Sequence, residues 1–248
     1  MAEVILLKTR GLKRHFGGLK AVDGVDFTLR KGEIRAIIGP NGAGKSTFVS
    51  LLSGRIPPSE GTVEFDGQDV TALPAHRRVR LGIAYTFQIT NIYPSMSVLE
   101  NVAVAAQSRL RPSFLRKGAS ETEIEDAARA ALAAVGLDDR LDEVAGVLAY
   151  GHQRLLEVAM GLALEPKLLI LDEPTQGLSD SEIANFIEVV KRVAQSSTVL
   201  LIEHNMHVVM SLADRITVLE RGRLLAEGSP AEIMNDKAVQ AAYLGEPA

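Results

Sequence analysis

The sequence reads Gly39-Pro40-Asn41-Gly42-Ala43-Gly44-Lys45-Ser46-Thr47 directly after the apolar run Ile34-Arg35-Ala36-Ile37-Ile38. It matches the phosphate-loop pattern G-x-x-x-x-G-K-[ST], and the flanking residues are compatible with a strand and a helix, which is the setting that the motif requires. Glycines let the backbone curl so that successive N–H groups and the start of the helix point at one anion. Lys45 would place its charge on the β- and γ-phosphates, and the Ser46 hydroxyl would bind Mg²⁺. The stretch predicts a nucleoside triphosphate site rather than an ordinary glycine-rich turn.

Two adjacent acids, Asp172-Glu173, follow a second informative stretch, the apolar run Leu168-Leu169-Ile170-Leu171. Such a continuous run is typical of a buried parallel strand, so a carboxylate at its end could reach Mg²⁺ beside the phosphate loop. Side chains alternate in direction along a strand, which lets the two acids serve different purposes. We expect Asp172 to hold the metal and Glu173 to act as general base toward the attacking water. The alternative is a solvated acidic turn before Pro174.

The rest of the chain divides by its pattern into β-rich and helix-rich parts. Residues 3–38 and 61–67 show short alternating strands, which suggest an antiparallel sheet beside the nucleotide site. From about residue 97 to 164 the chain is rich in Ala, Leu, Val and Glu, and a capping box at Ser120 predicts a helix that Gly136 ends. After Pro166 the alternation of strand and helix resumes, with further apolar runs at residues 198–202 and 216–219 and a second capping box formed by Ser179 and Glu182.

These patterns predict an α/β fold, in which a P-loop NTPase core with a mixed or parallel sheet is joined to an antiparallel β subdomain and an inserted α-helical subdomain. A chain of 248 residues forms one large domain or two small ones. We expect a single domain over residues 1–248. Its core would span residues 1–88 and 165–225, its helical subdomain about 89–164, and a C-terminal extension about 226–248.

Composition narrows the classes of protein that remain. A hydrophobic content of 46% and a charged content of 23% fit a globular protein. The net charge of −4 gives no bulk electrostatic case for binding nucleic acid. Local basic clusters at residues 76–80 and 109–117 are interpreted as solvated faces. The absence of cysteine excludes disulfides and thiolate metal sites. Without a signal peptide or a long uncharged apolar run, the chain is expected to be cytoplasmic.

The order of these and further motifs resembles the ATP-binding cassette of ABC proteins over essentially the whole chain. Phe16 matches the aromatic residue that stacks on adenine, and Gln88 the glutamine that touches Mg²⁺ and senses the γ-phosphate. Leu148-Ala149-Tyr150-Gly151-His152-Gln153 takes the position of the family's signature, and His204 that of the switch histidine that contacts the γ-phosphate. The resemblance implies ATP and Mg²⁺ as cofactors. By themselves, Phe16 could be a core residue, Gln88 a loop amide and His204 a helix-start histidine.

Two positions depart from the family's pattern. The signature usually reads Leu-Ser-Gly-Gly-Gln, whereas Ala149 replaces its serine and Tyr150 its first glycine. The hydroxyl that would meet the partner's γ-phosphate is therefore absent, and the N–H of Gly151 with the N-terminus of a helix expected near Gln153 remain as anion donors. The loop after Glu173 usually ends in aspartate but carries Ser179 here; Asp180 could substitute, or Ser179 could cap its helix.

The resemblance narrows to the branched-chain (hydrophobic) amino-acid uptake type of cassette. It rests on Phe16-Gly17-Gly18-Leu19-Lys20-Ala21-Val22, the Leu-Ala-Tyr-Gly signature, Ile202-Glu203-His204-Asn205-Met206 and the tail Ala242-Tyr243-Leu244-Gly245-Glu246. Implied partners are a second cassette in a homo- or heterodimer, transmembrane permease subunits and, indirectly, an extracytoplasmic solute-binding protein, with no nucleic acid. The implied location is peripheral, on the cytoplasmic face of the inner membrane. Apolar residues between 88 and 98 would either line a groove for a permease helix or pack locally.

Other classes fit less well. A chromosome-associated ABC ATPase would contain a long coiled-coil insertion, and the helical segment here is too short for one. A translation-associated ABC protein would carry two cassettes in one chain, and this chain has one. A small-molecule kinase would have no need of His204 or of the signature. The alternative that remains is a soluble ABC-type ATPase that acts in the assembly of a non-transport complex.

Overall fold

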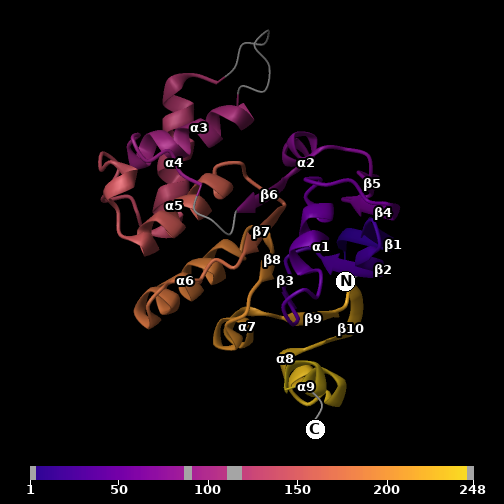
Figure 1. Ribbon diagram of the computed structural model, residues 1–248. Coiled ribbons are helices and arrows are strands. Elements are labelled where there is room, and N and C mark those ends of the chain that lie inside the picture. Colours follow the sequence, from indigo (N-terminus) through magenta and orange to yellow (C-terminus); the bar gives the residue numbers. More distant parts are fainter. Residues whose placement is uncertain (1–3, 87–90, 111–118, 245–248) are drawn as a thin grey trace.

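The computed structural model describes residues 4–86, 91–110 and 119–244 (Figure 1). The described residues form two β-sheets with helices around them. One sheet has the strand order β2-β1-β4-β5, and the other has the order β10-β9-β3-β8-β7-β6. Non-consecutive neighbours in the second sheet mean that the chain repeatedly crosses over it. This is the arrangement expected of an α/β fold.

The smaller sheet is antiparallel, as predicted for this part of the chain. Its strands are β1 (Ile5–Phe16), β2 (Leu19–Arg30), β4 (Glu60–Phe65) and β5 (Gln68–Asp69). The alternation in β2 buries Val25, Phe27 and Leu29. Phe27 packs edge-on against Phe48, with ring centroids 5.4 Å apart, which ties this sheet to the helix that follows the phosphate loop.

The larger sheet holds the core of the protein. Five of its strands run parallel and β10 pairs antiparallel with β9. Every residue of β3, β7 and β8 is buried, as expected when helices cover both faces of a parallel sheet. Its strands are β3 (Ile34–Ile38), β6 (Ile83–Thr86), β7 (Leu168–Asp172), β8 (Thr198–Ile202), β9 (Arg215–Glu220) and β10 (Arg223–Gly228).

Helices connect these strands, and the longest run of them lies between β6 and β7. In Figure 1 the helices α3, α4 and α5 form a group away from the smaller sheet. The predicted capping box at Ser120 and the end of α4 at Gly136 are both present. The helices are α1 (Lys45–Leu52), α2 (Ala75–Leu81), α3 (Val98–Leu110), α4 (Glu121–Val135), the short η1 (Ala145–Val147), α5 (Tyr150–Leu162), α6 (Asp180–Val193), α7 (Met206–Leu212), α8 (Pro230–Met234) and α9 (Lys237–Leu244).

One residue of the first basic cluster is not solvated, which corrects the sequence interpretation. Arg78 on α2 is buried, and its guanidinium donates to the carbonyl oxygens of Leu51 and Leu52, both at 2.8 Å, at the end of α1. It also donates to the carbonyls of Leu73 and Thr71 at 2.9 and 3.0 Å. Burial lowers its pKa to about 10. The periodicity of α2 does not reveal this role, because the acceptors are backbone atoms from other segments.

The segment after β10 adds a short helical extension. The chain enters α8 through a capping box formed by Ser229 and Glu232. In Figure 1 these last helices lie below β9 and β10. Within the described ranges, no helix combines the length and apolar character needed to cross a membrane.

Candidate nucleotide site

The phosphate loop joins β3 to α1 and depends on glycine at two positions. Gly39 has φ 152°, and a Cβ there would lie 2.2 Å from the carbonyl oxygen of Leu219. Gly44, the N-cap of α1, has φ 97°, and a Cβ there would lie 2.2 Å from the carbonyl oxygen of Ala21. L-residues rarely adopt such angles, and the neighbours are backbone atoms that cannot move aside cheaply. The loop therefore curls tightly, with the N-terminus of α1 at its end.

Lys45 begins α1 and folds back over the loop. Its Nζ donates to the carbonyl oxygens of Gly39 at 2.7 Å and Pro40 at 3.1 Å. Burial lowers the pKa of Lys45, and the nearby charges of Glu173 and Asp172 oppose that shift. An ammonium held by two neutral carbonyls beside two acids is placed to meet an anionic phosphate.

Asp172 ends β7 and is only 4% exposed. Its Oδ2 accepts a hydrogen bond from the hydroxyl of Tyr85 on β6, while its Oδ1 is buried and has no hydrogen-bond partner among the described residues. Burial raises the pKa of Asp172, and the Tyr85 hydroxyl opposes that shift. An unsatisfied buried carboxylate oxygen calls for a cation or a donor, so the residues present fit Mg²⁺, with the Ser46 hydroxyl as a further oxygen ligand.

Glu173 and His204 meet at the carboxyl edge of the large sheet. Oε1 of Glu173 lies 2.9 Å from Nε2 of His204. The strands β7 and β8 are parallel neighbours with Asp172 opposite Ile202, and the N–H of Glu173 donates to the carbonyl of Ile202 at 2.9 Å. Glu173 has a left-handed backbone with φ 47°, a conformation that costs energy for a residue with a side chain.

A cavity of about 480 Å³ brings these groups together. It is lined by Leu19, Lys20, Ala21, Asn41, Gly42, Ala43, Gly44, Lys45, Ser46, Thr47, Glu173, His204 and Arg221. The phosphate loop from Asn41 to Thr47, Glu173 and His204 thus line one cavity. Asp172 is not among the residues that line this cavity.

Other predicted residues lie elsewhere. Phe16 is not on the cavity wall; it is 46% exposed at the turn between β1 and β2, paired with Leu19, and the Arg14 guanidinium lies 4.5 Å from its ring centroid. Gln88 lies outside the described residues. Gly151 faces a different, small cavity that it shares with Glu182.

The signature helix begins earlier than predicted. The helix α5 starts at Tyr150 with Ala149 as N-cap, not near Gln153. Gln153 is the residue whose N–H donates to the carbonyl of Ala149 at 3.1 Å, so it completes the first turn rather than opening the helix. Ser179 is the N-cap of α6 and forms a capping box with Glu182, which agrees with the capping alternative. The pKa of Glu182 is lowered by hydrogen bonds from Ser179 and, less strongly, from the backbone of Gly151.

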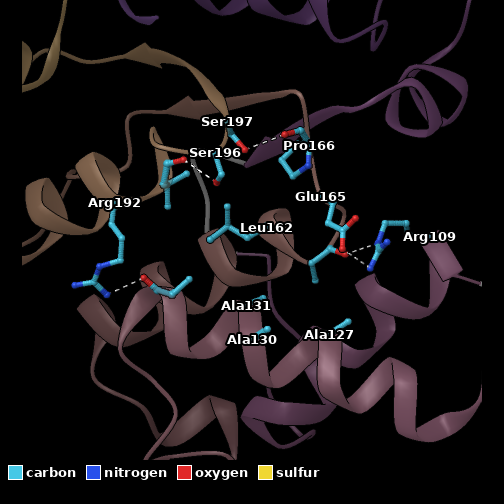
Figure 2. A pocket seen from close by; sticks show the side chains of 13 residues that line it. Arg109, Ala127, Ala130, Ala131, Leu162, Glu165, Pro166, Arg192, Ser196 and Ser197 are labelled. Carbon is cyan, nitrogen blue, oxygen red and sulfur yellow. Dashed lines mark hydrogen bonds and ion pairs between the residues drawn. The ribbon is translucent and has the colours of Figure 1, made fainter. Parts of the chain in front are cut away.

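Another cavity, of about 410 Å³, lies between α3, α4, α6 and the chain around Pro166 (Figure 2). Its two arginines are engaged within the chain. Arg109 pairs with Glu165 at 2.9 Å, and Arg192 donates to the carbonyl of Ala134 at 3.0 Å. The floor is mostly alanine side chains of α4 (Figure 2). This cavity contains none of the described residues that the sequence predicted for a site.

The sequence analysis missed several contributors to the site: Leu19, Lys20, Ala21 and Arg221 on the cavity wall, and Tyr85 beside Asp172. Tyr85 lies on β6 next to β7, its hydroxyl donates to Asp172, and the Arg55 guanidinium lies 4.7 Å from its ring centroid. Burial, followed by the hydrogen bond to Asp172, raises its pKa. This contact could be predicted only if the pairing of β6 with β7 were known, and the sequence contains no signal for that pairing.

A phosphate loop between a parallel strand and a helix, with an acidic pair at the end of another parallel strand of the same sheet, is typical of P-loop NTPases. Here β8 lies between the two strands, β3 and β7. Comparison with known proteins specifies the family. The family model described as ABC transporter matches residues 22–176, and the one described as branched-chain amino acid ATP-binding cassette transporter matches residues 223–248. The chain belongs to the ABC transporter family and is an ATPase that binds nucleotide, which confirms the predicted family and fold class.

Relatives and solved structures cover nearly the whole chain. It is 38% identical to the high-affinity branched-chain amino acid transport ATP-binding protein BraF of Pseudomonas aeruginosa, over 97% of this chain and 98% of that protein. It is 39% identical to the corresponding protein LivG of Escherichia coli (strain K12), with the same coverage. The ADP conformation of MJ1267, an ATP-binding cassette of an ABC transporter, superposes with a TM-score of 0.87 at 29% identity, over 98% of this chain and 100% of that one.

Proposed function

We propose that this chain is the ATP-hydrolysing subunit of an importer for branched-chain amino acids or a related small polar or hydrophobic solute. The observation that carries the proposal is the match of the C-terminal residues 223–248 to the branched-chain type of cassette, together with end-to-end similarity to BraF and LivG. A match to the general ABC transporter model alone would not distinguish the branched-chain type of cassette from other types. The alternative, a soluble assembly ATPase, has no support among these relatives.

In this proposal the phosphate loop from Gly39 to Thr47 binds the ATP phosphates through its backbone N–H groups and Lys45. Ser46, Asp172 and Gln88 would hold Mg²⁺, which when bound would neutralise charge on the β- and γ-phosphates. Glu173 takes a proton from the attacking water, and His204 holds both Glu173 and the γ-phosphate. Phe16, at the turn between β1 and β2, would stack on adenine.

The site of one chain is completed by a second cassette, which contributes its own signature helix. Gly151 at the start of α5 would serve the partner's nucleotide, since it lines a different cavity from the phosphate loop of its own chain; its N–H, which donates to Glu182 here, would have to be released. ATP would then close the pair by supplying contacts to both subunits, and hydrolysis would release them.

The helices between residues 89 and 164 would form the subdomain that faces a transmembrane permease. Within residues 88–98, Tyr93 is 48% exposed, whereas Ile92 packs against the core. The division into core residues 1–88 and 165–225, helical subdomain 89–164 and C-terminal extension 226–248 is part of the same proposal. The location would be peripheral, on the cytoplasmic face of the inner membrane, with a solute-binding protein on the other side.

The first experiment is affinity purification of the tagged chain from gently solubilised native membranes, followed by mass spectrometry. We expect polytopic membrane subunits, with or without a second cassette, to be recovered with it. Reconstitution of that complex in vesicles with the associated binding protein should give ATP-dependent uptake of labelled leucine. Recovery of soluble partners alone would overturn the transport proposal and favour the assembly alternative.

A further inference from the structure

Glu203 is a buried carboxylate between two loops of the nucleotide site. It follows β8 directly and is only 3% exposed. A charged side chain this deeply buried costs free energy unless it is fully hydrogen-bonded. Its partners therefore indicate its role.

Each oxygen of Glu203 serves a different loop. Oε1 accepts from the N–H of Thr175 at 3.0 Å and from the Thr175 hydroxyl, in the segment that follows Glu173. Oε2 accepts from the N–H of His204 at 2.8 Å and from the N–H of Asn205 at 3.0 Å. One carboxylate thus joins the turn after Glu173 to the turn that carries His204.

These contacts show that Glu203 does not act as a second general base beside Glu173. Both of its oxygens are occupied by donors of its own chain, and it is not on the wall of the nucleotide cavity. Glu173 and His204 do line that cavity and lie 2.9 Å apart. Glu203 can act on the reaction only through the positions of these two residues.

We infer that Glu203 is a positioning residue that sets the geometry of Glu173 and His204 for hydrolysis. The inference rests on the ATPase activity of the family, and it holds whichever solute is transported. The carboxylate is needed because it is the side chain that offers only acceptors. Four donors converge on it, two on each oxygen. An amide in its place would turn an NH₂ group toward one pair of N–H or O–H donors.

Glu203→Gln in the purified full-length chain tests this inference. Steady-state ATP hydrolysis and the stoichiometry of Mg-ATP binding are measured together, so that kcat refers to binding-competent chains. Since small misplacements of reacting groups are costly, we expect kcat to fall at least about tenfold, while the KM for ATP changes by less than about twofold because the phosphate loop is untouched. An unchanged kcat per binding-competent chain would overturn the inference.

Glu33→Gln is the matched control. Glu33 is also buried, and it accepts from Arg35 Nε at 2.6 Å and from the N–H of Arg30 at 2.9 Å, at the end of β3 remote from the phosphate loop. We expect this variant to melt at a lower temperature but to keep its kcat per binding-competent chain. If it lost kcat as Glu203→Gln does, the effect would be general destabilisation and the inference would be wrong.

Thr175 supplies a second test that does not depend on Glu203→Gln folding. Thr175→Val removes the hydroxyl donor and keeps the backbone donor, so we expect a smaller fall in kcat, about threefold. Thr175→Ser restores the hydroxyl and should restore the rate, whereas a serine variant as slow as the valine one would contradict the inference. A wild-type chain without ATPase activity would instead contradict the activity itself.

Discussion

Glu173 and His204 lie 31 positions apart in the sequence, yet Oε1 of Glu173 is 2.9 Å from Nε2 of His204. The contact follows from the sheet, because β7 and β8 are parallel neighbours and their carboxyl ends meet at one edge. Glu173 has a left-handed backbone, its N–H donates to Ile202, and it lines the same cavity as the phosphate loop. Two residues proposed for hydrolysis are therefore in contact in the structure.

Glu173→Gln should keep ATP binding and nearly abolish hydrolysis. The amide retains the size of the side chain but cannot accept a proton, so a loss of about 10²-fold or more in kcat is expected. Measurement of single-turnover hydrolysis beside ATP binding separates the two effects.

The control for this variant is Glu165→Gln. Glu165 has the same φ of 47° and an exposed side chain remote from the nucleotide cavity, so its amide should leave the rate unchanged. Wild-type turnover by Glu173→Gln would remove Glu173 from the role of base.

Lys45→Ala should lose both binding and hydrolysis. The ammonium offers donors that now reach the Gly39 and Pro40 carbonyls, and its removal deletes the charge expected to meet the β- and γ-phosphates. We expect ATP affinity to fall by about 100-fold, equivalent to roughly 3 kcal/mol. Fluorescent ATP titration measures it, with Lys191→Ala on the exposed face of α6 as the control; equal affinities of the two variants would contradict the assignment.

The fold and most of the site could be predicted from local patterns. The phosphate loop needs glycine where the backbone approaches Leu219 and Ala21, and the buried runs that became β7 and β8 are apolar throughout. The glycine pattern and the apolar runs each lie within a few consecutive residues, and so do the capping boxes at Ser120 and Ser179.

What could not be predicted depends on strand order and on backbone acceptors. The Tyr85–Asp172 bond requires β6 to lie beside β7, and the two loops joined by Glu203 meet only because β7 lies beside β8. The helix α5 begins at Tyr150, three residues before the predicted start near Gln153. Gln153 donates the N–H bond to the N-cap residue Ala149 that closes the first turn. Each of these features arises from contacts that sequence spacing does not encode.

Tyr85→Phe should raise the Mg²⁺ concentration required for hydrolysis. The hydroxyl donates to Oδ2 of Asp172 and leaves Oδ1 as the oxygen proposed for the metal. Loss of a partner that orients a metal ligand typically costs about 10- to 100-fold in metal affinity. ATPase rates measured over a Mg²⁺ titration should show this shift, whereas ATP binding without Mg²⁺ should be unaffected.

Tyr93→Phe is the control for that titration, because Tyr93 is half exposed and lies outside the nucleotide cavity. Coincident Mg²⁺ titrations of the wild type and Tyr85→Phe would show that the hydroxyl does not orient Asp172.

Arg78→Met should destabilise the fold without changing the chemistry of the site. The substitution keeps an apolar stem of similar length but removes the donors to the carbonyls of Leu51 and Leu52 and to two others. Leaving buried acceptors unpaired costs about 1–3 kcal/mol each, partly recovered by relaxation, so we expect the free energy of unfolding to fall by about 3 kcal/mol. For Arg77→Met, on the exposed side of α2, the free energy of unfolding should fall by less than about 0.5 kcal/mol. Urea denaturation of both variants measures the difference, and equal midpoints would mean that the Arg78 guanidinium adds nothing to the stability of this junction.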